Sequence, residues 1–413
     1  MFYSTFTNLS LLFLLLVPAS SVHNATLHLL NSKEYPNARC LDGSPYGIYF
    51  RSSPDNATAT EKKSFMVVLN GGGLCTHKSD CTSRSKTELG TSTVWSSNFD
   101  LDSVAYLTTD IRNPFRNWNL IFSPYCTGDM HAGQRTSANN DTFGLYFSGY
   151  QNILATIDYL STNYGLNSTG NTLVWSGGSA GGVGVFSTLD SVSLRLPNVR
   201  VVGAPVGGFP PEIYWSTTKG SHAPEEDVRT PAFKANNALY DGILPYTCAN
   251  AMGSKESYKC AVPHIAYQYL QTPVMILESL TDVVISCAFE GMPCQPAWKG
   301  LLNPDNWKRW GNYGVNASAM FQSTVGQDKR GKNGLFAPSC LLHTGFTLDG
   351  PFINGINGIQ ATWNWMYPSS FNDSSKGDQR DFYVDSCKNN KFYPPCGDKC
   401  PAIKEELQFH HHV

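Results

Sequence analysis

The feature that most constrains the fold is a glycine-flanked serine between a strand-like run and a helix-like run. Residues 171–182 read NTLVWSGGSAGG, so Ser179 stands in a Gly-x-Ser-x-Gly pattern directly after the apolar run Thr172–Trp175. Bulky side chains two positions from such a serine would collide with the strand and the helix. The pattern predicts a nucleophile elbow, in which a strained serine precedes a helix whose first N–H groups face an oxyanion.

Apolar runs on both sides of this elbow predict an α/β fold. Most of them are continuous instead of alternating, which is typical of strands covered on both faces. Helix-like stretches at Gly144–Tyr164 and Val183–Leu196 lie between them. We therefore expect a central, mostly parallel sheet flanked by helices. The expected strands are Ser64–Leu69, Ser103–Leu107, Asn119–Phe122, Thr172–Trp175, Arg200–Ala204 and Pro273–Leu277.

The chain of 413 residues begins with a segment typical of a signal peptide, residues 1–21. Leu11–Val17 is apolar, and the small residues up to Ser21 suit cleavage by signal peptidase, while the segment is too short to span a bilayer. No repeat or low-complexity linker interrupts the rest. We expect residues 22–413 to form a single catalytic domain, with Lys299–Lys332 and a cysteine-bearing segment from about residue 378 to 413 as loop-rich additions that decorate the core.

The glycosylation sequons and the cysteines both favour a protein that is exported from the cell. The 12 cysteines lack the paired CxxC spacing of zinc sites, so disulfides are expected. Plausible pairs are Cys75 with Cys81, Cys248 with Cys260, Cys287 with Cys294, and Cys40 with Cys126, although spacing leaves the connectivity open. Six sequons predict N-glycosylation at Asn24, Asn56, Asn140, Asn167, Asn316 and Asn372.

The charge of the chain limits the classes of partner that it can bind. The net charge is −2 and no extended basic run occurs, which argues against nucleic acid and against a charged membrane surface as partners. Three adjacent histidines at the end of the chain, His410 to His412, fix no coordination geometry and are interpreted as a tail. We expect neither a metal nor a cofactor.

A serine nucleophile needs a base and a carboxylate that orients the base. In α/β-hydrolases the acid follows the serine, just after a later strand, and the histidine comes last. Asp282 fits best because it follows the apolar run Pro273–Leu277, and Glu278, closer to the strand body, is the runner-up. The histidine is then His343, in FAPSCLLHTGF, where Cys340 could anchor the loop.

Other histidines fit this order less well. His77 and His131 precede the serine, though each could border the cleft. His222 and His264 follow the serine, but either could be the base only if the acid were Asp227 or Asp241. Both of these acids lie in polar stretches without a preceding strand, and the pairings stay open as alternatives.

A glycine-rich loop supplies candidates for the other half of an oxyanion hole. Asn70-Gly71-Gly72-Gly73-Leu74-Cys75 follows the strand-like run, and consecutive glycines let backbone N–H groups approach a ligand. A phosphate-binding loop is the competing use, but no lysine follows in the required spacing. We assign the oxyanion hole to the N–H groups of Gly73, Leu74 and Ala180.

Taken together, these residues resemble the pectin acetylesterase and Notum family of secreted carboxylesterases. The resemblance runs from about Cys40 to Cys387. It implies an α/β-hydrolase-like fold, a triad of Ser179, Asp282 and His343, and hydrolysis of esters on extracellular substrates. The matching pieces, in the family's order, are Cys40–Pro45, Gly71–Gly73 with Cys75, Tyr125-Cys126-x-Gly128, Ser176–Gly182, Thr272-Pro273 before Asp282, and Ser339–His343.

Three positions depart from the family's pattern. Asn70, Leu74 and Thr127 stand where the family usually has Glu, Trp and Asp. A backbone donor survives a change of side chain, whereas the loss of an indole at position 74 alters the wall against which an acyl group would pack. The departures therefore bear on substrate preference more than on the oxyanion hole.

We expect a secreted serine carboxylesterase that removes O-acetyl groups from pectin or a related polysaccharide of a cell wall or matrix. Catalysis would pass through an acyl-enzyme without metal or cofactor. One alternative is a Notum-like deacylase of a lipid-modified secreted protein, which needs a deep apolar pocket. Another is a catalytically silent binding protein that keeps the hydrolase fold.

Overall fold

The computed structural model describes residues 23–211, 229–288, 304–328, 331–368, 382–388 and 396–401. Several sequence predictions lie outside these residues. They are the signal peptide at 1–21, the sequon at Asn372, the Cys287–Cys294 pair, the alternatives His222 and Asp227, and the C-terminal histidines.

A ten-stranded sheet forms the centre of the described structure. Its pairings are parallel from β12 through to β5, and three antiparallel pairings add β2, β1 and β4 at one edge. The predicted, mostly parallel sheet is confirmed. The strands in sheet order are β12 (Phe382–Val384), β9 (Gly334–Ala337), β8 (Met275–Leu277), β7 (Arg200–Val206), β6 (Thr172–Gly178), β3 (Ser64–Leu69), β5 (Asn119–Ser123), β2 (Gly47–Arg51), β1 (Asn24–Leu29) and β4 (Asn98–Asp100).

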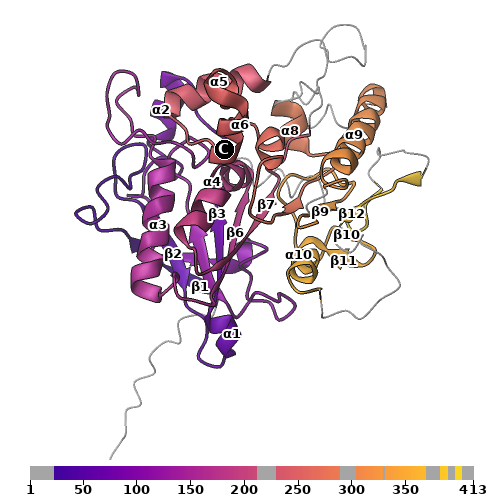
Figure 1. Ribbon diagram of the computed structural model, residues 1–413, viewed down its shortest axis with the longest axis horizontal. Helices are drawn as coiled ribbons and strands as arrows, with labels where there is room; N and C mark the ends of the chain where they lie inside the picture. The colour runs from indigo at the N-terminus through magenta and orange to yellow at the C-terminus, as the bar shows by residue number, and fades with distance from the viewer. Residues whose placement is uncertain are drawn as a thin grey trace, which may run out of the picture.

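Helices cover both faces of the sheet. Figure 1 shows β3, β6 and β7 side by side at the centre, with α3 and α4 beside them and the orange α9 and α10 at the right. Side chains of α3, α4 and α9 pack in one core cluster, and those of α10 pack in the cluster on the other face of the sheet. The remaining elements connect the strands or lie near their ends. The helices are α1 (Ala59–Lys62), α2 (Lys78–Arg84), α3 (Gly149–Tyr164), α4 (Ala180–Arg195), α5 (Arg229–Tyr240), α6 (Tyr246–Glu256), α7 (Pro263–Tyr267), α8 (Val283–Ala288), α9 (Pro304–Thr324) and α10 (Gly358–Met366); η1 (Leu101–Ser103) and η2 (Ser257–Ala261) are 3₁₀ turns, and β10 (Phe352–Ile353) pairs with β11 (Ile356–Asn357).

Strand β3 shows why the apolar runs are continuous. Successive side chains of a strand point to opposite faces, and here Val67 and Leu69 belong to one core cluster while Met66 and Val68 belong to the other. All six residues of the strand are buried. Both faces of the central sheet are thus packed, as the sequence predicts.

The predicted strand Ser103–Leu107 is wrong. Asp100 accepts a hydrogen bond from the N–H of Asp102 and starts η1, after which Leu107 donates to the carbonyl of Val104 in a turn. Local hydrogen bonds of this kind compete with a strand ladder. The apolar side chains of this segment are buried against the face of the sheet instead of joining it.

Helix α9, within the stretch 299–332 that was expected as decoration, contributes to the core. In α9 the side chains of Tyr313, Ala317 and Phe321 recur every four residues and pack into the same cluster as α3 and α4. A spacing of four keeps them on one face of the helix.

Disulfides fix loops around the sheet. The expected pairs Cys40–Cys126, Cys75–Cys81 and Cys248–Cys260 are confirmed. Cys340 is anchored as expected, to Cys400, and Cys387–Cys396 was not foreseen. Within the described ranges, no helix combines the length and apolar character that a membrane span requires.

Candidate active site

Ser179 stands at the turn between β6 and α4. Its φ of 56° and ψ of −121° are strained for a residue with a side chain. A Cβ on Gly177 would lie 2.5 Å from the carbonyl oxygen of Gly181, and a Cβ on Gly181 would lie 2.2 Å from that of Leu69. Glycine is therefore required two positions before and after Ser179, and the predicted elbow geometry is present.

The predicted acid and histidine lie next to each other. His343 Nδ1 is 2.6 Å from Asp282 Oδ2, and both side chains are buried. The other carboxylate oxygen of Asp282 accepts hydrogen bonds from the N–H groups of Val284 and Ile285, at 2.8 and 2.7 Å. These bonds stabilise the charged form of Asp282 and fix the direction in which it faces the imidazole.

The loop that carries His343 packs against the elbow and the strand beside it. A Cβ on Gly207, directly after β7, would lie 2.6 Å from the His343 carbonyl oxygen. A Cβ on Gly178 would lie 3.5 Å from Cγ2 of Thr344. Because Gly178 precedes Ser179 and Thr344 follows His343, the serine and the His343–Asp282 pair meet at the same end of the sheet.

Glu278, the runner-up acid, lies beside Asp282. It is buried, and it accepts hydrogen bonds from the N–H groups of Phe209 and Ser279 at 2.8 and 3.2 Å. Burial and, secondly, the charge of Asp282 raise the pKa of Glu278 well above its usual value. Glu278 also shares a hydrogen bond with Asp282, and Asp282 is the carboxyl that lies against His343 Nδ1.

The glycine loop lies against the serine. A Cβ on Gly71 would come 2.8 Å from the Cβ of Ser179, so only glycine allows this approach. Gly72 and Gly73 adopt φ of 139° and 65°. Leu74 packs partly buried in a small apolar cluster near the Cys75–Cys81 disulfide. Ala180 begins α4, where N–H groups have no partner within the helix.

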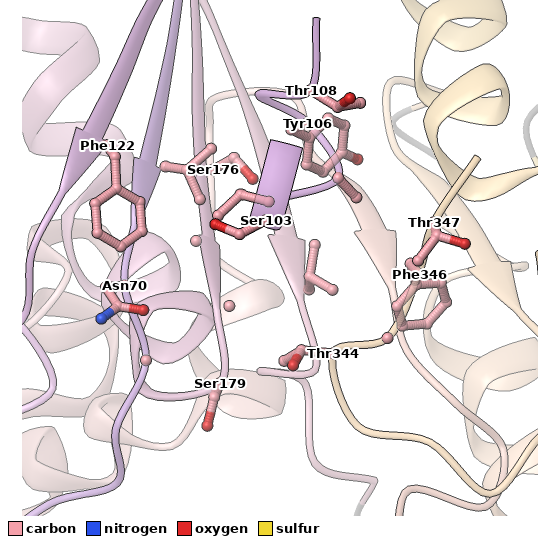
Figure 2. A pocket seen from close by; sticks show the side chains of 18 of the residues that line it. Asn70, Ser103, Tyr106, Thr108, Phe122, Ser176, Ser179, Thr344, Phe346 and Thr347 are labelled. Carbon is pink, nitrogen blue, oxygen red and sulfur yellow. The ribbon is translucent and has the colours of Figure 1, made fainter. Parts of the chain in front are cut away.

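A cavity of about 660 Å³ opens at Ser179. Figure 2 shows Ser179 and Asn70 at one end of it, with Phe122, Ser176 and Tyr106 further along and Thr344 and Phe346 on the other side. Much of its lining is apolar. The apolar lining residues are Val68, Leu69, Leu89, Val104, Ala105, Tyr106, Phe122, Val206, Val284, Phe346, Leu348 and Ile359.

Charged residues also line the cavity. Arg112 is held between two carboxylates, with Nη2 at 2.8 Å from Asp110 Oδ2 and Nη1 at 2.5 Å from Asp349 Oδ1. Its hydrogen bonds lower the pKa of Asp110 to about 2. Asp102 and Glu88 complete the charged lining, so four carboxylates face one guanidinium among the described residues of this cavity.

The other predicted site residues are placed as follows. The sequon residues Asn24, Asn56, Asn140, Asn167 and Asn316 are exposed, and glycosylation at them stays a prediction. His264 is buried in α7, and Asp241 lies in an exposed turn. His77 precedes α2, whereas His131 reaches the glycine loop, with Nε2 2.9 Å from the carbonyl oxygen of Asn70.

The sequence did not reveal the residues whose side chains hold the glycine loop in place. Tyr125 donates a hydrogen bond to the carbonyl of Gly73 at 3.0 Å, and the buried Asp129 organises the turn that carries His131. The Tyr125-Cys126-x-Gly128 motif was visible as a family feature. Its contact with a loop some fifty residues earlier could not be read from spacing.

The sequence of the chain is similar to those of known carboxylesterases. The pectinacetylesterase family model matches residues 19–388. The palmitoleoyl-protein carboxylesterase NOTUM of Schmidtea mediterranea is 26% identical over 79% of this chain and 60% of its own length, and notum1a of Danio rerio is 24% identical over 93% and 74%. The chain thus spans three fifths of the planarian relative.

A solved structure gives the same picture of the fold. The Wnt deacylase Notum from Drosophila superposes with a TM-score of 0.72 at 23% identity, covering 92% of this chain and 100% of that one. The α/β-hydrolase-like fold expected from the sequence is confirmed.

Proposed function

The chain belongs to the pectinacetylesterase family, and we propose that it is a serine carboxylic ester hydrolase whose nucleophile is Ser179. The observation that carries this proposal is the buried pair of His343 and Asp282, 2.6 Å apart, in a loop that packs against the Ser179 elbow. A serine needs such a base and orienting acid to become a nucleophile.

Two acyl-transfer steps follow from these roles. His343 takes the Ser179 proton as the hydroxyl attacks the ester carbonyl, and returns it to the departing alcohol as the acyl C–O bond breaks. Water then attacks the acyl-enzyme with help from the same base, which frees the acid. Asp282 holds the ring and stabilises the imidazolium. The N–H groups of Gly73, Leu74 and Ala180 bind the oxyanion, each contributing about 3 kcal/mol of transition-state stabilisation.

The first candidate substrate is an O-acetylated polysaccharide outside the cell, such as pectin. Membership of the family supports this choice, and the disulfides suit an oxidising, extracellular compartment. The charged residues of the cavity narrow this choice of substrate. Four carboxylates against one guanidinium repel a polyanion, so a methyl-esterified pectin or a neutral acetylated glycan suits the cavity better than free polygalacturonate.

The cavity also supports a second candidate, the removal of a long acyl chain from a secreted protein. A volume of about 660 Å³ with many apolar lining residues exceeds what an acetyl group fills and is in the range that holds drug-sized ligands. Relatives carry the name palmitoleoyl-protein carboxylesterase, which describes this reaction in them.

A series of p-nitrophenyl esters from acetyl to palmitoyl separates the candidates, with acetate release from acetylated, methyl-esterified pectin as the natural-substrate assay. A kcat/KM that falls steeply with chain length, together with acetate release, supports the polysaccharide deacetylase. A kcat/KM that rises with chain length supports the deacylase. Absence of hydrolysis across the series, by a folded and glycosylated protein, would overturn both in favour of a binding protein.

A further inference from the structure

The glycine loop beside Ser179 is held at both ends by side chains that follow β5. His131 Nε2 lies 2.9 Å from the carbonyl oxygen of Asn70, and the Tyr125 hydroxyl donates to the carbonyl of Gly73 at 3.0 Å. The loop between these carbonyls consists of three glycines. Glycine loses more conformational freedom on ordering than other residues, so such a loop needs external contacts to keep one shape.

These carbonyls control the direction of N–H groups. The peptide bond is planar and trans, so a carbonyl that is fixed on one side fixes the N–H of the next residue on the other. The carbonyl of Gly73 shares its plane with the N–H of Leu74, and that of Asn70 shares its plane with the N–H of Gly71. The N–H of Gly73 lies between these two held peptide planes.

Tyr125 and His131 are themselves fixed. The Tyr125 hydroxyl accepts from the N–H of Met130 at 2.7 Å, so its proton is committed to the Gly73 carbonyl. Burial lowers the pKa of His131 to about 4, so the ring is neutral. A carbonyl only accepts, and therefore Nε2 carries the proton. The two rings pack against each other at a tilt of 31°, with 4.7 Å between their centroids.

Asp129 holds the turn that carries Met130 and His131. Its Oδ1 accepts from the Thr127 hydroxyl at 2.5 Å and from the His131 N–H at 3.1 Å, and its Oδ2 accepts from the N–H of Gly149, the first residue of α3, at 2.8 Å. Met130 and His131 have φ of 54° and 60°, which the carboxylate helps to hold. A Cβ on Gly184 of α4 would lie 3.0 Å from the His131 Cβ, so this turn also contacts the helix that begins at the elbow.

We propose that Tyr125 and His131 are positioning residues that keep the oxyanion-binding N–H groups of the glycine loop aimed at the position beside Ser179. The proposal rests on the proposed serine esterase activity. Neither side chain is assigned contact with substrate. Both act through the carbonyls of Gly73 and Asn70, and Asp129 holds the turn that presents them.

The test uses Tyr125→Phe, His131→Leu and His131→Gln, assayed with p-nitrophenyl acetate and with a trifluoromethyl ketone inhibitor of matched shape. The inhibitor forms a hemiketal with the serine and places an oxyanion where the transition state does. We expect Tyr125→Phe and His131→Leu to lower kcat/KM about tenfold or more through kcat, with little change in KM. His131→Gln retains an N–H donor and should recover part of the loss.

The inhibitor separates positioning from general damage. Its affinity should fall across the three variants in proportion to kcat/KM, while the fold, followed by circular dichroism, stays intact. Tyr49→Phe is the matched control, because Tyr49 is a buried tyrosine that donates to a backbone carbonyl elsewhere, that of Ser96 at 2.8 Å. We expect this control to keep wild-type kcat/KM and inhibitor affinity.

Variants that fold and keep both kcat/KM and inhibitor affinity would overturn the proposal. So would variants that lose activity without losing inhibitor affinity, since the oxyanion contacts would then be intact. Failure of the underlying function gives a different result, in which the wild-type protein and Ser179→Ala hydrolyse the ester equally slowly.

Discussion

His343 and Asp282 are 61 residues apart in the chain, yet His343 Nδ1 lies 2.6 Å from Asp282 Oδ2 in the buried interior. An ionised carboxylate accepts, so Nδ1 carries the proton and Nε2 is left as the basic nitrogen. The backbone N–H groups of Val284 and Ile285 hold Asp282 in this position. The pair thus selects the imidazole tautomer that a serine hydrolase needs.

Replacing the acid by its amide tests this selection. Asp282→Asn removes the charge that holds the tautomer, so we expect kcat for p-nitrophenyl acetate to fall about 10³-fold or more while the protein still folds. The measurement is the steady-state rate, with the melting temperature as the check on folding. A kcat within tenfold of wild type would show that Asp282 does not orient the base.

Glu278 is the matched control for that experiment, because it is the neighbouring buried carboxyl. Glu278→Gln should keep kcat within a few fold of wild type, since Asp282 and not Glu278 is the carboxyl that lies against His343 Nδ1. If Glu278 were the orienting acid, this variant would lose activity as severely as Asp282→Asn is expected to.

The same substitution has a consequence for stability. The raised pKa of Glu278 in the folded protein means that its contribution is fully present below the unfolded value of 4.5 and is lost as pH rises toward the folded value. We therefore expect the free energy of unfolding of Glu278→Gln, measured with urea, to increase relative to that of the wild type as pH rises from about 5 to about 8. An unchanged difference across this range would contradict a raised pKa.

The contact between Gly71 and Ser179 predicts a steric effect. In Gly71→Ala the added methyl would meet the Gly178 carbonyl oxygen at 2.7 Å and the Ser179 Cβ at 2.8 Å, so the loop must shift. We expect kcat/KM for p-nitrophenyl acetate to fall about tenfold or more. Gly311→Ala in α9, with no atom within 4 Å of the added methyl, should keep wild-type activity and be slightly more stable. Equal activity of both variants would contradict the close approach.

The carboxylates around Arg112 predict a preference among pectins. At low salt, acetate should be released more slowly from acetylated pectin with few methyl esters than from pectin with many, and added salt should narrow the gap. The double variant Asp110→Asn with Asp349→Asn frees Arg112 and should raise the rate on the poorly esterified pectin only. The cavity lining would have no part in substrate choice if both pectins reacted equally at low salt.

Local chemistry made the elbow and the order of the site residues predictable from the sequence. Glycines two positions from Ser179 follow from sterics, and the chain order of serine, acid and histidine pointed to Asp282 and His343. Continuous apolar runs located β3, β5, β6 and β7. The run Ser103–Leu107 is as apolar as those strands, but the Asp100 cap starts a 3₁₀ turn with local hydrogen bonds. A prediction from apolar residues alone does not take such a cap into account.

Contacts between distant segments were beyond the sequence. Glu278 and Asp282 looked like alternatives, whereas in the fold they are hydrogen-bonded neighbours and Asp282 is the one that lies against His343 Nδ1. Tyr125 and His131 stand well apart in sequence from the carbonyls that they hold, and only the folded chain brings these groups together. The cavity combines residues from β3, β5, β6, β7, η1, α8, α10 and several loops, so its volume and charge depend on the whole topology.

The measurement that tests the account most directly is the kcat of Ser179→Ala with p-nitrophenyl acetate, on protein secreted in the same amount as the wild type. We predict a fall of several orders of magnitude, because the hydroxyl that forms the acyl-enzyme is gone while the oxyanion donors remain. Undiminished ester hydrolysis by this variant would contradict Ser179 as the nucleophile.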